Sequence, residues 1–199
     1  MLQLIKSGSI ILIIIFILII IMSYTLKQKT ERQNYRLVKT VQEIEIRFYP
    51  KAIMATVNSP SETYTGNSNN NFSKLAGYIF GGNQASNKIS MTAPVHMERN
   101  KESSNMSFVM PANYKMEQLP KPNDESIKLH YSEEGYFAAI KFGGYANEKT
   151  IVKKEDELKR KLKELGILHN NKFVFLGYNA PWDVINRENE VLVKIEYTE

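Results

Sequence analysis

The chain has no cysteine among its 199 residues, only three histidines and a single tryptophan. The absence of cysteine excludes disulfide bonds, thiolate metal sites and cysteine nucleophiles. The sequence also lacks a nucleophile elbow, a His-Glu-x-x-His motif, a P-loop and a dinucleotide-binding glycine pattern. No common catalytic chemistry is therefore indicated, and we expect a protein that is not an enzyme.

The chain also has little excess charge once its N-terminus is set aside. Three of its 26 basic side chains lie in the first 29 residues, which contain no acidic residue, and the remaining 23 are matched by 21 acidic ones. A nucleic-acid surface needs clustered lysine and arginine. We therefore expect no nucleic-acid partner.

One long apolar run is present, and it lies at the N-terminus. Every residue from Ile10 to Ile21 is Ile, Leu or Phe, and no charge occurs from Ser7 to Leu26. This length is close to the roughly 20 residues that cross a bilayer. The run favours insertion by roughly 4–7 kcal/mol. A cleaved signal peptide is the alternative, although no small-x-small cleavage site follows the run.

We predict a single-pass transmembrane anchor over residues 1–26, a polar linker over 27–34 and a folded domain over 35–199. More positive charge follows the apolar run than precedes it, beginning with Lys27 and Lys29. The positive-inside rule then favours a cytoplasmic domain, whereas a secreted-type signal anchor would place the domain outside. The many Ile, Lys and Asn residues are typical of an AT-rich, bacterial genome.

The rest of the sequence alternates between strand and helix patterns. In the first strand, Ile44, Ile46 and Phe48 alternate with polar residues, which predicts a strand with one solvated face. Apolar residues recur at helical spacing over 72–79 and 148–165. Further strands are predicted over residues 53–57, 89–95, 106–110, 127–131, 136–142, 173–178 and 191–197.

These elements give the order ββαββ twice, which indicates an internal repeat. Ala93-Pro94 and Ala180-Pro181 occupy similar places in the two halves and support this interpretation. We therefore predict an α+β fold: a distorted antiparallel β-barrel of two ββαββ-type repeats with two flanking helices, preceded by the transmembrane helix.

The most informative segment is Lys-Ile-Ser-Met-Thr-Ala-Pro-Val-His-Met at residues 88–97. This segment resembles the signature of the SOUL/haem-binding family, and the resemblance extends over about residues 35–197. The other matching segments, in family order, are Glu45-Ile-Arg-Phe-Tyr49, Phe72-Ser-Lys-Leu-Ala76, Phe108-Val-Met-Pro111, Pro120-x-Pro122, Tyr178-Asn-Ala-Pro-Trp182 and Asn189-Glu-Val191.

The resemblance implies a haem or related tetrapyrrole ligand, held weakly in an open apolar cleft. Residues of the family segments supply candidates for an apolar groove and for lysines that would pair with the haem propionates. These haem-binding candidates are Phe72, Leu75, Ile79 and Met91, with Lys74 and Lys88. The alternative is that the four apolar residues are ordinary core.

Haem iron usually takes a histidine ligand. His96 is the candidate because it ends the signature segment; His130 is out of phase with its apolar neighbours, and His169 lies in a polar turn. The expected role is carriage, buffering or sensing of haem near a membrane. Two alternatives remain open: a small-molecule hydrolase that uses Glu190 beside Trp182, and a membrane-held protein-interaction domain.

Overall fold

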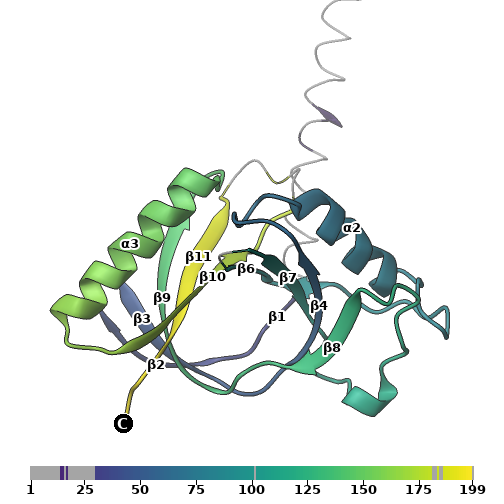
Figure 1. Ribbon diagram of the computed structural model, residues 1–199, viewed down its shortest axis with the longest axis horizontal. Coiled ribbons are helices and arrows are strands. Elements are labelled where there is room, and N and C mark those ends of the chain that lie inside the picture. The colour runs from purple at the N-terminus through teal and green to yellow at the C-terminus, as the bar shows by residue number, and fades with distance from the viewer. Residues whose placement is uncertain are drawn as a thin grey trace, which may run out of the picture. The chain divides into compact units, whose positions relative to one another are not determined.

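The computed structural model describes residues 14, 15, 17, 30–100, 102–180, 183 and 186–198. It divides into two compact units, Met1–Thr30 and Glu31–Glu199. Most of the predicted anchor lies outside the described residues. Among those that are described, no helix is both long enough and apolar enough to cross a membrane. The second unit contains the sheet and both long helices (Figure 1).

Nine strands form one antiparallel sheet in the order β2-β3-β9-β11-β10-β6-β7-β4-β8. Their bounds are β2 Arg36–Val41, β3 Ile44–Tyr49, β4 Ile53–Ser59, β6 Val95–Arg99, β7 Ser104–Val109, β8 Ile127–Tyr131, β9 Gly135–Gly143, β10 His169–Gly177 and β11 Glu188–Ile195. The predicted antiparallel sheet is confirmed, but it does not close into a barrel: β2 and β8 are the two edges, and within the described residues no pairing joins them.

The strand order carries the internal repeat. Without β2, the order is β3-β9-β11-β10-β6-β7-β4-β8. Exchanging β3 with β8, β4 with β9, β6 with β10 and β7 with β11 gives the same order read from the other edge of the sheet. The β6–β10 pair lies at the centre of this symmetry. The Ala-Pro pairs are not equivalent, however, because Ala93 precedes β6 whereas Ala180 follows β10. The repeat is therefore present, but its supposed marker is a coincidence of sequence.

Two helices cover one face of the sheet (Figure 1). Helix α2, Ser68–Ile79, packs against β4 and β7, and helix α3, Glu148–Glu164, packs against β9, β10 and β11. Met97 contacts the apolar clusters under both helices, so the two helices lie on the same side. This part of the fold prediction, two flanking helices on an antiparallel sheet, is confirmed.

The signature segment forms two short strands rather than one. Strand β5, Thr92–Ala93, ends just before Pro94, and β6 begins just after it at Val95. A proline has no N–H to donate to a ladder, which explains the interruption. Strand β1, Glu31–Arg32, pairs in parallel with β5. The polypeptide at residues 31–34, predicted as linker, therefore packs on the domain.

The sheet face opposite the helices, called the inner face below, has its own smaller apolar cluster. Tyr49, Ala139, Val174, Leu176 and Leu192 form it. Side chains alternate across a strand, so neighbours of these residues point to the helices instead. For example, Val191 and Val193 belong to the cluster under α3. None of the helices in the described part of the chain covers the inner face, and this leaves room for a site.

Candidate functional site

A hollow of about 380 Å³ lies on the inner face. Its apolar floor consists of Tyr49, Met54, Phe137, Val174 and Leu192, which come from five different strands. Its polar lining is Gln33, His96, Glu98, Ser107, His130, Tyr131, Ser132, Glu133, Asn170, Lys172 and Lys194. An apolar floor with polar groups around it is the usual form of a small-molecule site.

His96 projects into this hollow from β6. Its neighbour Val95 packs under α2, so alternation along the strand turns His96 to the inner face. The side chain is 7% exposed, and its Nε2 lies 2.8 Å from Oε1 of Gln33. Burial lowers the pKa of His96 to about 4. The ring is therefore neutral near pH 7, which is the form that binds iron.

A hydrogen-bonded row of side chains crosses the strands beside His96. Ser107 Oγ lies 2.7 Å from Thr56 Oγ1, which lies 2.8 Å from Nε2 of His130. His130 is exposed and lines the hollow. No group of three or more His, Asp or Glu that suits a metal ion occurs in the described part of the chain. Haem brings its own four nitrogens, so a single histidine suffices for its iron.

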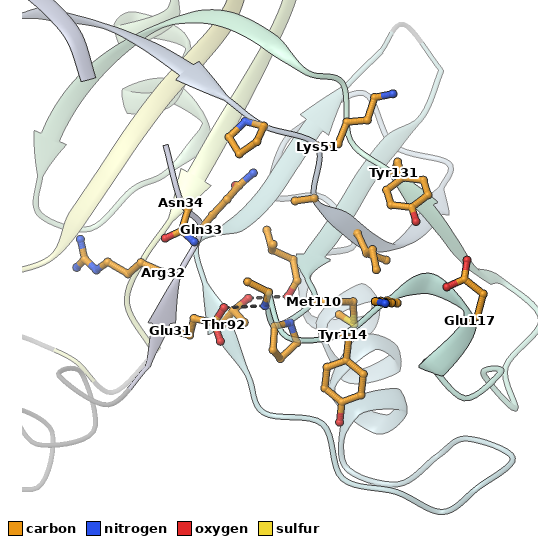
Figure 2. Close-up of a pocket in the computed structure, with 17 residues that line it drawn as sticks. Glu31, Arg32, Gln33, Asn34, Lys51, Thr92, Met110, Tyr114, Glu117 and Tyr131 are labelled. Atoms are coloured by element: carbon orange, nitrogen blue, oxygen red, sulfur yellow. Dashed lines mark hydrogen bonds between the residues drawn. The ribbon is translucent and has the colours of Figure 1, made fainter. Parts of the chain in front are cut away.

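A second hollow has a volume of about 330 Å³, and Figure 2 draws the residues that line it. Both hollows are lined by Gln33 and Tyr131. The second has an apolar floor that includes Ile53, Val109 and Met110. Its rim carries Lys51 and Lys115 as well as the acidic residues Glu31 and Glu117.

A buried ion pair lies on the inner face near the floor of the first hollow. Two Arg47 nitrogens donate to the two carboxylate oxygens of Glu190 at 2.7 Å each, and the Tyr178 hydroxyl donates to Glu190 at 2.8 Å. Arg47 also donates to the Tyr49 hydroxyl and to Glu45. Burial is the largest single influence on the pKa of Arg47 and lowers it, but the hydrogen bonds and charges of Glu190 and Tyr49 together outweigh burial and the net pKa is raised. Burial raises the pKa of Tyr178.

Comparison with known proteins identifies the family. The model of the SOUL heme-binding protein family matches residues 30–194. The chain belongs to the SOUL haem-binding family. Mouse heme-binding protein 2 is 28% identical over 155 residues, which is 74% of this chain and 75% of the mouse protein. Pig heme-binding protein 1 is 34% identical over 76 residues, 38% of this chain and 40% of the pig protein.

Solved structures with the SOUL chain's fold are more distant in sequence. An uncharacterized conserved protein from Listeria innocua has a TM-score of 0.60 at 12% identity, covering 78% of this chain and 93% of its own. A hydrolase from Listeria innocua has a TM-score of 0.57 at 10% identity, covering 80% of this chain and 94% of its own. The EcmrR C-terminal domain has a TM-score of 0.57 at 11% identity, covering 80% of this chain and 100% of its own. At such identities the likeness shows the fold alone.

The structure places the candidate residues from the SOUL resemblance on two different faces of the sheet. Phe72, Leu75, Ile79 and Met91 all belong to the apolar cluster under α2, where Leu75 and Ile79 are fully buried. Lys74 Nζ lies 3.1 Å from Ser126 Oγ, and Lys88 is exposed. None of these six residues lines either hollow. His96 lies on the opposite face, so it is not brought together with the other six.

Two features of the site escaped the sequence patterns. The expectation of a solvated face on β3 is wrong at Arg47, whose side chain is fully buried against Glu190. No local signal marks this pairing, because the two residues are far apart in the chain and meet across β9. Gln33 lay in the predicted linker, and a lone glutamine there gives no sign that it will contact His96. Trp182, which was expected beside Glu190, lies outside the described residues.

Proposed function

We propose that this SOUL chain binds haem or a related tetrapyrrole on the inner face of its sheet. The observation that carries the proposal is the family match over residues 30–194. The relatives named above are heme-binding proteins, and the family's model matches residues 30–194 of this chain. The physiological role would be to carry, buffer or sense the ligand without transforming it.

The first hollow supports the inner face as the location. Its floor of aromatic and aliphatic side chains suits a flat apolar ring. Lys172 and Lys194 lie at its lining and would pair with propionates; Lys194 now contacts Glu133 at 2.7 Å. His96 would supply the iron ligand. The α2 candidates remain the alternative location, with Phe72 and Met91 half-buried there and Lys74 and Lys88 beside them.

The state of Glu190 favours a binding role over hydrolysis. Glu190 does face the inner side, as a hydrolytic carboxylate would, but it is 1% exposed. Arg47 and Tyr178 occupy its oxygens at 2.7–2.8 Å. A general base must reach a substrate proton directly or through one water. A carboxylate held in this way has no free oxygen to offer.

We also propose that residues 1–26 tether the domain to a membrane, with the domain on the cytoplasmic side. The support is the uncharged apolar run and the lysines that follow it. The near balance of charge over the rest of the chain supports a partner other than nucleic acid.

The test is a haem titration of the full chain in detergent, with detergent alone as the blank. We expect a shift of the Soret band and quenching of the single tryptophan at micromolar haem. No shift and no quenching would overturn the function. Two matched charge reversals locate the ligand: Lys172→Glu/Lys194→Glu on the inner face and Lys74→Glu/Lys88→Glu beside α2. Weaker binding in the first variant alone supports the inner face, and weaker binding in the second alone overturns that location.

A further inference from the structure

A short segment lies across the inner face at the boundary of the two hollows. This strap consists of residues 31–35. Glu31 and Arg32 pair with Thr92 and Ala93, and the Gln33 N–H donates to the Ala93 carbonyl at 2.8 Å. The Gln33 side chain then lies 2.8 Å from Nε2 of His96. The strap therefore occupies Nε2 of His96, the histidine that β6 places at the hollow.

The rest of the strap is held by side-chain contacts, and the Glu31 carboxylate also accepts a hydrogen bond from the Ala112 N–H at 2.8 Å. Arg32 donates to both oxygens of Glu188 at 3.1 and 2.7 Å, and its guanidinium lies 4.9 Å from the centre of the Tyr178 ring. Tyr35 stacks 4.2 Å from the Arg47 guanidinium. The Arg32–Glu188 pair is 46% and 31% exposed, and exposed pairs add little stability. Strand β1 is only two residues long, and every strap side chain except that of Gln33 is exposed, which are features of segments that open at low free energy.

The position of Gln33 decides how large the site is. Gln33 lines both hollows, and in Figure 2 it lies with Asn34 across the second hollow from Tyr131 and Glu117. Pockets for drug-sized ligands run from about 300 to 1,000 Å³. Each hollow alone, at about 330 and 380 Å³, is at the small end of that range. A tetrapyrrole with two propionates needs a larger space.

We infer that the complete ligand site is a single groove, formed when the strap leaves the inner face and the two hollows join. This inference rests on the proposed function and adds its regulation. In the strapped state Gln33 divides the groove and holds His96. In the released state His96 Nε2 is free for iron, and the groove carries lysines at both ends, Lys172 and Lys194 at one and Lys51 and Lys115 at the other.

A cross-link tests whether the strap must move. The chain has no cysteine, so Arg32→Cys/Glu188→Cys can be joined selectively by a short bis-maleimide. The matched control is the same variant with both thiols capped by N-ethylmaleimide, which removes the ion pair but leaves the strap free. If haem binds only when the strap is open, the apparent affinity of the free protein scales with its open fraction, and locking the strap closed removes that fraction. We expect haem affinity at least about tenfold weaker in the cross-linked form than in the capped form. Equal affinities would overturn the inference.

A second variant keeps the test decisive if the cross-linked protein folds poorly. Gln33→Ala removes the side chain that divides the groove, so it should bind haem severalfold more tightly than the wild type. Its Soret band should also shift in a way that Gln33→Ala/His96→Ala abolishes. If the wild type binds haem and Gln33→Ala has the same affinity and spectrum, the inference that the strap divides the groove is overturned, while the proposed function stands. A wild type that binds no haem would instead overturn the proposed function.

Discussion

At the residue scale, the least expected feature is the Arg47–Glu190 pair beneath the inner face. Arg47 is fully buried, and each partner satisfies the other with two hydrogen bonds of 2.7 Å. Removing one partner of such a pair leaves a buried charge without compensation, which costs far more than the pair itself contributes. The consequence is that the two residues behave as a unit.

Replacement of Arg47 alone should therefore be severe. We expect Arg47→Met to lower the free energy of unfolding by about 3–5 kcal/mol, because Glu190 is left unpaired. Arg47→Met/Glu190→Leu should lose clearly less than the single variant. Urea denaturation followed by circular dichroism measures both. As a control, Lys194→Met breaks the exposed contact with Glu133 and should cost less than about 1 kcal/mol. A double variant as unstable as Arg47→Met would contradict this account.

The buried imidazole of His96 predicts a dependence of stability on pH. Burial lowers its pKa from 6.5 to about 4 in the folded chain, so between these values the unfolded chain binds more protons. Stability is then fully present above about pH 6.5 and is lost as pH falls towards 4, by up to about 3 kcal/mol. Unfolding midpoints in urea at several pH values measure the loss. His96→Gln should show a shallower decline over this window; an identical decline in both proteins would refute the assignment to His96.

At the element scale, local periodicity predicted most of the framework. The spacing of apolar residues predicted a helix over 148–165, and α3 spans Glu148–Glu164. Alternation predicted a strand over 127–131, which is β8. Strand β2 was missed because it lies at an edge, where its side chains are mostly exposed and show no clean alternation.

The candidate site was harder to predict than the framework, for a physical reason. Periodicity shows which residues share a face of a strand or helix, but not what covers that face. The pattern correctly grouped Phe72, Leu75 and Ile79 on one side of α2, and only the packed structure shows that side against the sheet. His96 and Met91 are five residues apart, so alternation alone predicts opposite faces for them, but it does not show which face is covered by α2 and which carries the hollow.

A substitution in α2 separates a core role from a ligand role. Leu75 is fully buried, so Leu75→Ala should lower the free energy of unfolding by about 2–5 kcal/mol through the cavity it creates. Haem affinity, measured well below the denaturation midpoint, should stay within about twofold of the wild type, because Leu75 lies on the far side of the sheet from the inner face. Lys74→Ala is the surface control, with an expected cost within about 0.5 kcal/mol. A large loss of haem affinity in Leu75→Ala would instead show that haem binds beside α2.

At the scale of the whole molecule, the domain's repeat and its single strap create an asymmetry. The eight strands related by the repeat are symmetric in order, but the strap and β2 come only from the N-terminal side of the domain. Movement of the strap away from the inner face would therefore depend on the N-terminal side of the domain, which supplies the strap.

The membrane anchor can be tested independently of the ligand. Each lysine placed near the centre of a spanning helix costs about 2.5–3.5 kcal/mol of insertion free energy, so two lysines offset the roughly 4–7 kcal/mol that favours the native run. We expect the wild-type chain to stay with membranes after alkaline carbonate extraction and Ile14→Lys/Ile17→Lys to be largely released. Haem affinity of the released variant should match the wild type, because the second compact unit begins at Glu31. Extraction of the wild type itself by carbonate would show that the apolar run does not span the bilayer.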